Sequence, residues 1–414
     1  MGYIKNTLTG FGWMGGSRAV TRGFSIIRTI ILARILLPSD FGVYGIVLIV
    51  LAILELLTET GINIFLIQED DENIDKYIDT AWVVSIVRGV LIFLLLLVTA
   101  PTIAKFFNTF EVVPLIYLAS LVPLIRGFIN PSQVKLQKNL QFGKEFGLRT
   151  SVFVFDCTVA IVAAFILKSP SALILGLIAG AVMEVILSFM IVSPFPKFKF
   201  EKTKSLKVVR TGKWITLAGI FDYLAKNGDN LVVGKLLGTT ALGFYQMAYT
   251  FSTLPVTEVS DVSGKVVFPI YTRIAGDQKR LKRAYLLLIL AVTAVASGMA
   301  VVFFVFAKPI VLLVLGDNWL PIVEPLKILS IFGAIKAISG TSSALFLGLK
   351  KQHLVTIVTF VRFITLAIVV VPLTLSMGIY GTALAALISS VVALPVIIFF
   401  LTRVLVSSGS SKVI

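Results

Sequence analysis

The sequence predicts an all-α polytopic membrane protein with about twelve transmembrane helices in two six-helix lobes. Three observations indicate this. Of its 414 residues 57% are hydrophobic and only 14% charged, whereas soluble proteins carry about 25% charged residues. Apolar stretches of about 20 residues, each long enough to cross a hydrocarbon core about 30 Å thick, recur along the chain. Finally, the two halves of the sequence resemble each other.

The first lobe is expected over residues 1–200 and the second over 214–414, with a basic cytoplasmic linker at 201–213. Backbone groups in lipid must be satisfied within their own segment, so each stretch is predicted to be a helix. In chain order the predicted spans are 11–34, 43–66, 78–100, 112–130, 148–167, 171–194, 212–235, 242–267, 284–306, 322–348, 353–375 and 378–402.

The two halves resemble each other when the sequence is aligned with itself at an offset of 201 residues. Trp13 then falls on Trp214, Gly42 on Gly243 and Tyr44 on Tyr245. Six spans per half is an even number, so both halves enter the membrane in the same sense. This predicts a parallel pseudo-twofold repeat, with a substrate site between the halves.

Most lysines and arginines outside the spans fall on the side that also holds both termini, which predicts that both termini are cytoplasmic. The net charge of +16 does not indicate a nucleic-acid partner, because its most basic stretch, 195–213, fits a topology-fixing segment at lipid headgroups. Cys157 and His353 are the only residues of their types, which leaves no cysteine cluster or multi-histidine metal site. No catalytic or nucleotide-binding motif is present, so no enzyme activity and no cofactor are expected, apart from a coupling Na⁺ or H⁺.

Charged side chains inside the predicted spans are the candidate site residues. Asp222, Lys226, Asp229 and Asn230 fall within one quadrant of a helix, and charges facing lipid are costly. Basic groups outnumber acids, which predicts a water-filled cationic cavity for an anion. Pairing of these charges within the protein remains the alternative. Arg126 lies near the cytoplasmic face and is expected to extend to the membrane surface. The basic and amide candidates are Arg18, Arg22, Arg28, Arg88, Lys226, Asn230, Lys336 and Arg362; the acids, for coupling or gating, are Asp156, Glu184, Asp222, Asp229, Glu258 and Asp261.

Several motifs resemble one known family. Asp229-Asn230, Gly234, Gly238, Gly243 and Tyr245 form DNxxxGxxxGxxxxGxY, and LLPSDFG at 36–42, KLQKNLQF at 135–142 and LGDNW at 315–319 accompany it in order. This resembles the Wzx-type polysaccharide flippases of the multidrug/oligosaccharidyl-lipid/polysaccharide exporter superfamily, which also holds the MATE and MurJ transporters. The resemblance implies a flippase of the cytoplasmic (inner) membrane, using alternating access, coupled to H⁺ or Na⁺.

The cargo implied by the resemblance is an undecaprenyl-diphosphate-linked oligosaccharide, with a polysaccharide polymerase and glycosyltransferases of the same pathway as partners. Because a diphosphate is anionic, this cargo agrees with the predicted cationic cavity. A multidrug or cation antiporter of the same superfamily is the first alternative, and a membrane glycosyltransferase or ligase the second. Many members of the family continue beyond twelve helices, so further C-terminal helices are a possibility that the sequence leaves open.

Overall fold

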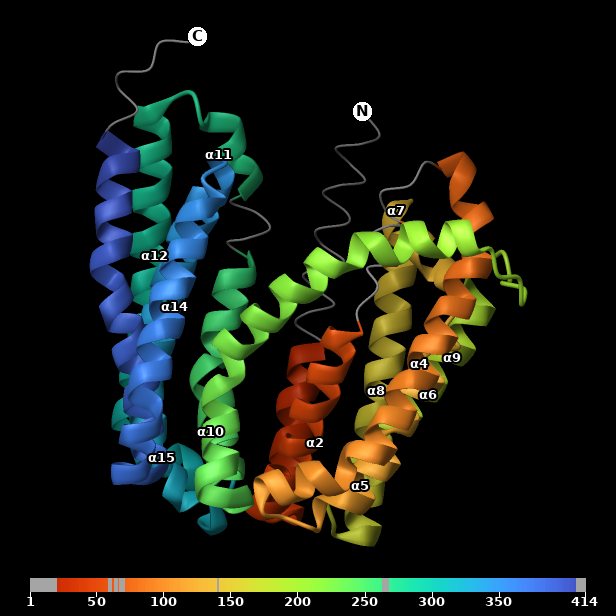
Figure 1. Ribbon diagram of the computed structural model, residues 1–414. Coiled ribbons are helices and arrows are strands. Elements are labelled where there is room, and N and C mark those ends of the chain that lie inside the picture. The colour runs from red at the N-terminus through yellow and green to blue at the C-terminus, as the bar shows by residue number, and fades with distance from the viewer. Residues whose placement is uncertain are drawn as a thin grey trace. The chain divides into compact units, whose positions relative to one another are not determined.

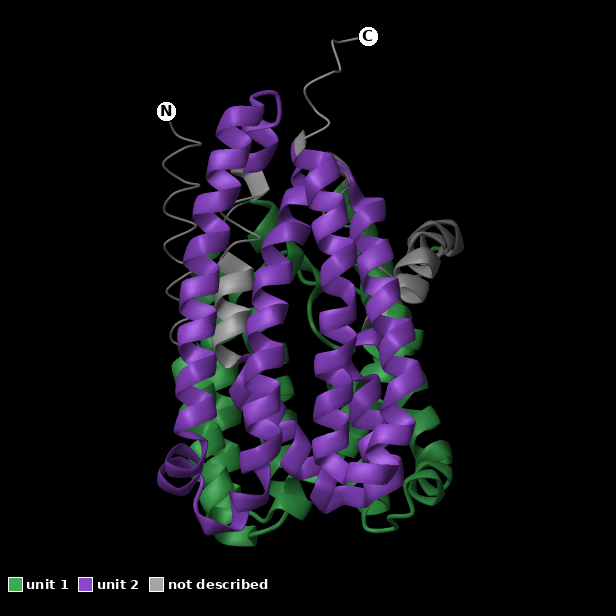
Figure 2. Cartoon of the chain, turned by 90° about the vertical axis from the view of Figure 1, so that its left-hand side faces the viewer, with its two compact units in different colours: residues 1–224 green, residues 225–414 purple. Residues whose placement is uncertain are grey.

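The computed structural model describes residues 21–58, 62, 66, 71–139, 141–262 and 268–406. Within its helices, the side chains of residues 71–73, 202–218, 220, 222, 254–262, 268–270 and 406 are not described. The described residues are almost entirely helical and contain no strand, which confirms the all-α part of the predicted fold class. The chain divides into two compact units, Met1–Leu224 and Ala225–Ile414, coloured separately in Figure 2.

Unit 1 consists of helices with short connections (Figure 1). Residues 21–35 are helical, and the first part of α10, up to Leu224, is the last element of the unit in sequence. The elements between are α2 (Pro38–Leu57), α4 (Asp71–Phe107), α5 (Val112–Ala119), α6 (Leu121–Arg126), η1 (Pro131–Gln133), α7 (Val134–Lys138), α8 (Phe142–Leu167) and α9 (Ser171–Ile191).

Small residues let the helices of unit 1 pack closely. Ala160 and Ala164 of α8 and Ala172 of α9 are fully buried and form one cluster with Leu32 and Leu36. On α9, a Cβ added at Gly176 would lie 2.7 Å from the Cβ of Ala160, closer than real side chains approach. The α8–α9 hairpin is therefore packed backbone against backbone, as is common for small residues in membrane helices.

Unit 2 contains α10 (Lys202–Val262) from Ala225 onward, α11 (Phe268–Ile274), α12 (Gln278–Val305), α13 (Ala307–Val314), η3 (Asp317–Ile322), α14 (Val323–Gly348) and α15 (Gln352–Val406). Helix α14 packs against both α12 and α15. Its core includes Ala337 against Val292 and Ala296 of α12, and Phe346 against Leu354 and Val404 of α15.

Helices α10 and α15 each double back at a glycine (Figure 1). The breaks are Gly238, with φ 84° and ψ −174°, and Gly378, with φ 60° and ψ −142°. These conformations are essentially restricted to glycine, because a Cβ would meet the backbone. Across Gly378, Val358 packs with Ala393 and Ile397, and Leu366 packs with Ala385. Each of these two long helices is thus an antiparallel pair of arms. Helix α15 contains the predicted spans 353–375 and 378–402, and α10 contains the predicted span 212–235 and the described part of 242–267.

Six helices within the described residues are long and apolar enough to cross a membrane, or seven if the bent pair Val112–Arg126 and Pro131–Lys138 counts as one span. That pair bends by 69°, and Pro131 starts its second part. The protein is therefore a multi-pass membrane protein. The predicted basic linker at 201–213 is helical from Lys202 onward, as the start of α10.

Candidate functional site

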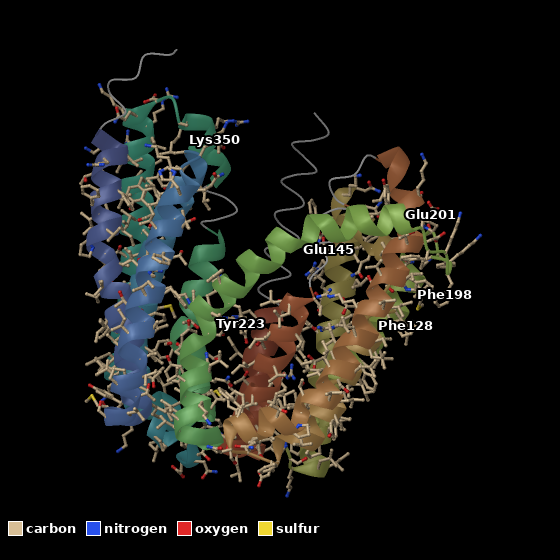
Figure 3. The ribbon with its side chains drawn as sticks, in the orientation of Figure 1. Phe128, Glu145, Phe198, Glu201, Tyr223 and Lys350 are labelled. Atoms are coloured by element: carbon tan, nitrogen blue, oxygen red, sulfur yellow. The ribbon has the colours of Figure 1, made fainter. Side chains whose placement is uncertain are left out.

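Unit 1 contains a cavity of about 530 Å³, within the usual size range of small-molecule sites. Its walls come from α2, α4, α6, the turn before η1 and Tyr223 of α10; Figure 3 labels Tyr223. The polar and charged side chains that line it are Glu55, Ser85, Arg88, Arg126 and Tyr223.

Arg88 is held against the C-terminal end of α2. Its Nη2 donates to the backbone oxygen of Glu55 at 2.7 Å, and its Nε donates to Thr58 Oγ1 at 3.3 Å. Both acceptors are uncharged, and they fix the direction of the guanidinium group. Arg88, a predicted site residue, lies in the wall of this cavity.

Arg126 lies between two carboxylates at the same cavity. Its Nη1 is 3.8 Å from Glu55 Oε1, and its Nε is 3.7 Å from Glu184 Oε2. These distances are at the outer limit of an ion pair, and 43% of the Arg126 side chain is exposed. Arg126, expected from the sequence to extend to the membrane surface, is one of the residues that line the cavity.

Two glycines bring the two arginines to one cavity. Gly89 follows Arg88 on α4, and Gly127 follows Arg126 at the end of α6. A Cβ added at Gly89 would lie 2.6 Å from the backbone oxygen of Pro123, and one added at Gly127 would lie 3.0 Å from that of Ser85. Only glycine permits this approach, so the repeated Arg-Gly pair is the sequence signal that could have identified Arg126.

The predicted arginines of the first span have different surroundings. Arg28 Nη1 donates to Asp156 Oδ2 of α8 at 3.0 Å, and the two side chains are only 13% and 12% exposed. Arg28 is therefore paired within the protein, which is the alternative that the sequence analysis left open. Arg22 lies half-buried on the same helix, and Arg18 lies outside the described residues.

Unit 2 contains a second polar cluster around Asp229, which is 3% exposed. Tyr245 Oη donates to Asp229 Oδ2 at 2.7 Å, and the backbone nitrogen and Nδ2 of Asn230 donate to Oδ1 at 2.8 and 3.2 Å. Asp229 and Tyr245 lie on opposite arms of α10, on either side of Gly238. The hairpin therefore explains why the DNxxxGxxxGxxxxGxY motif contains both residues.

One predicted basic residue, Lys336, joins this cluster through Tyr249, one turn after Tyr245. Lys336 Nζ of α14 donates to Tyr249 Oη at 2.9 Å and lies 5.2 and 5.5 Å from the ring centres of Tyr249 and Phe332. Arg362 of α15 has buried Nε and Nη2 atoms with no hydrogen-bond partner among the described residues. Sequence reasoning did not assign a role to Tyr249, although its spacing from Tyr245 places both on one helix face.

The other predicted residues complete the picture. Lys226 is exposed, and Glu184 contributes to the surroundings of Arg126. The side chains of Asp222, Glu258 and Asp261 lie outside the described residues. In the described part of the chain, no group of three or more His, Cys, Asp or Glu residues is arranged to hold a metal ion.

Comparisons with known proteins agree with this fold. The family model described as "Polysaccharide biosynthesis protein" matches residues 31–324. An "Uncharacterized membrane protein in cps region" of Klebsiella pneumoniae is 25% identical over 400 residues, which cover 96% of this chain and 82% of that protein. The "Lipopolysaccharide biosynthesis protein WzxC" of Escherichia coli (strain K12) is 23% identical over 347 residues, covering 83% and 70%.

Solved structures share the architecture at low identity. The "Lipid II flippase MurJ, inward closed conformation" matches with a TM-score of 0.76 and 15% identity, covering 93% of this chain and 86% of that one. An inward-facing multidrug resistance MATE family transporter of the MOP superfamily matches with a TM-score of 0.71 and 15% identity, covering 94% and 96%. The sequence-based family resemblance is confirmed: the chain belongs to the polysaccharide biosynthesis protein family and has the fold of MOP-superfamily transporters.

Proposed function

We propose that this protein is a flippase that carries undecaprenyl-diphosphate-linked oligosaccharide across the cytoplasmic membrane by alternating access. The observation that carries the proposal is the unit 1 cavity, where Arg88 and Arg126 line one space of about 530 Å³. Two relatives support it through their names, WzxC in lipopolysaccharide biosynthesis and TuaB, the "Teichuronic acid biosynthesis protein" of Bacillus subtilis (strain 168).

The cavity has the chemistry that a diphosphate needs. A diphosphate carries about two negative charges, and a guanidinium group binds phosphate oxygens through paired, charge-assisted hydrogen bonds. Arg126 is held at 3.7 and 3.8 Å by Glu184 and Glu55, so phosphate oxygens at closer range would replace weak contacts with strong ones. The hydrogen bonds of Arg88 to the Glu55 backbone oxygen and to Thr58 Oγ1 hold its guanidinium group in the cavity wall, and this pre-orientation supports a role in binding the cargo.

The other predicted site residues extend this assignment. We assign the diphosphate first to Arg88 and Arg126, because Arg28 is already paired with Asp156. The remaining candidates for the diphosphate or sugars are Arg18, Arg22, Lys226, Asn230, Lys336 and Arg362. The finer architecture is part of the same proposal: twelve helices in two repeated six-helix lobes, with both termini cytoplasmic. Glycosyltransferases and a polymerase of the same pathway would supply and consume the cargo.

We further assign a coupling H⁺ or Na⁺ to the buried Asp229 cluster of unit 2. A carboxylate that is 3% exposed and within 2.7 Å of a phenol hydroxyl is an expensive group to bury without a function. Replacing Asp229 with Asn should make flipping independent of the H⁺ or Na⁺ gradient. A variant that keeps the full gradient dependence would contradict this part of the assignment.

The direct test is a flipping assay in proteoliposomes with a fluorescent undecaprenyl-diphosphate oligosaccharide. Arg88→Ala and Arg126→Ala should each lower the initial rate by roughly 10- to 100-fold, since a hydrogen-bonded charge contributes about 1.5–3 kcal/mol. Arg149→Ala is the matched control, because Arg149 is 61% exposed and, in the described part of the chain, its ion pair is the local one with Glu145. Wild-type flipping rates for both cavity variants would refute the assignment of Arg88 and Arg126 to the diphosphate.

A drug-resistance screen separates the flippase from a multidrug antiporter, because only an antiporter would confer resistance on the cells that express it.

A further inference from the structure

The segment between α9 and α10 lies at a membrane boundary. Helix α9, Ser171–Ile191, has 21 residues and is about 31 Å long at 1.5 Å per residue, which matches the hydrocarbon thickness. Residues 192–201 follow it directly and are not helical. Irregular backbone is excluded from lipid-exposed hydrocarbon, and we therefore place the start of this segment at the headgroup region.

The segment is fixed to unit 1 by polar contacts. The backbone oxygen of Pro194 accepts hydrogen bonds from Asn130 Nδ2 at 3.2 Å and from Ser132 Oγ at 2.9 Å. Farther along, the backbone nitrogen of Lys197 donates to Asp79 Oδ1 at 2.8 Å. Asn130 and Ser132 are buried, so the segment is attached to the interior of the unit at one end and to α4 at the other.

Three phenylalanines on this fixed segment point outward. Phe195, Phe198 and Phe200 are 61%, 75% and 56% exposed, while Pro196 between them is buried. The ring of Phe198 rests on Trp82, with centroids 4.5 Å apart, and Trp82 Nε1 donates to the backbone oxygen of Phe128 at 3.1 Å. Figure 3 labels Phe198 and Phe128 close to each other on the same side of unit 1.

Lysines alternate with these rings. Lys197 lies between Phe195 and Phe198, Lys199 lies between Phe198 and Phe200, and both are exposed. Lys199 Nζ is 3.6 Å from Glu201 Oε1, in a pair whose lysine is 69% exposed. Exposed pairs of this kind are weak. The Asp79 carboxylate is engaged by the backbone of Lys197. The segment therefore presents apolar rings and ammonium groups side by side.

We propose that Phe195, Lys197, Phe198, Lys199 and Phe200 form an anchor that binds anionic phospholipid headgroups. The rings would enter the boundary between headgroups and acyl chains, while the two ammonium groups bind phosphate oxygens above them. Neutral phospholipids also offer phosphate, but only an anionic headgroup leaves a net negative charge for the lysines. The anchor is independent of the cargo cavity and of whether the protein is a flippase.

Trp82, beneath Phe198, provides the probe. The full-length protein is placed in nanodiscs of phosphatidylcholine with phosphatidylglycerol, and one lipid at a time carries bromine near the headgroup end of its acyl chains. Trp82 emission is obtained as the difference between the wild type and Trp82→Phe. Brominated phosphatidylglycerol should quench Trp82 more strongly than brominated phosphatidylcholine at equal mole fraction, and native mass spectrometry should show retained phosphatidylglycerol.

Lys197→Gln with Lys199→Gln should abolish this preference, with an expected loss of about fivefold in local enrichment for each lysine. Lys279→Gln with Lys282→Gln is the control, because both lysines are exposed at the start of α12, and it should leave the preference intact. Equal quenching by the two brominated lipids would overturn the proposal. So would a phosphatidylglycerol preference that survives in the Lys197→Gln/Lys199→Gln variant.

Discussion

The close crossing of α4 and α6 can be tested by adding one methyl group. In Gly89→Ala, the new Cβ would lie 2.6 Å from the backbone oxygen of Pro123 and 3.3 Å from Gly127 Cα. Both are backbone atoms, so relief requires a shift of one helix. Overpacking of this kind costs about 1–3 kcal/mol. For a unit of this size the cost corresponds to roughly 2–12 °C in apparent melting temperature.

The assay is the thermal unfolding of purified protein in detergent, followed by intrinsic fluorescence at one scan rate. Gly127→Ala should have a smaller effect, because its tightest contact would be 3.0 Å. Gly147→Ala on α8 is the control, since nothing lies within 4 Å of its added Cβ, and it should be neutral or slightly stabilising. The reasoning is refuted if Gly89→Ala melts with the wild type, or if the three variants do not follow this order.

Two further predictions concern the buried ion pair and a helix break. Arg28→Ala should destabilise the protein by about 3–5 kcal/mol, because it leaves the Asp156 carboxylate buried and unpaired. The double variant Arg28→Met with Asp156→Leu should restore most of the apparent melting temperature. A double variant that melts no higher than Arg28→Ala would contradict the pairing. Gly378→Ala should lower the free energy of unfolding by about 1–3 kcal/mol, because alanine is strained at a φ of 60° and a ψ of −142°. Gly298→Ala should leave it unchanged, since Gly298 has an ordinary helical backbone and nothing lies within 4 Å of an added Cβ. Equal melting temperatures for the two variants would show that the break at Gly378 tolerates a side chain.

Much of the helical framework could be predicted from the sequence, because hydrophobic length and glycine position are local properties. The predicted spans 212–235 and 242–267 lie on either side of Gly238, and 353–375 ends shortly before Gly378, where the structure breaks α10 and α15. The basic charge of residues 201–213 did not decide their secondary structure, because lysine is also a good helix former, and α10 begins at Lys202.

The candidate site was less predictable than the helices. Charged residues within the apolar spans could be recognised by their type, and Arg88 and Asp229 were both identified in this way. Their partners could not be predicted, because a partner depends on which helices cross and at which residues along each helix they do so. Arg28 meets Asp156 across 128 residues of chain, and Arg126 lines a cavity because two glycines let α4 and α6 approach.

The sequence by itself determined that this is a helical, multi-pass membrane protein of a polysaccharide biosynthesis family. Composition, apolar length and ordered motifs are sufficient for that, since the bilayer permits few alternatives. The tertiary structure alone decided which buried charges neutralise each other and which share a cavity. Electrostatic pairing depends on separations of a few ångströms between side chains from distant helices, and sequence spacing does not encode those separations.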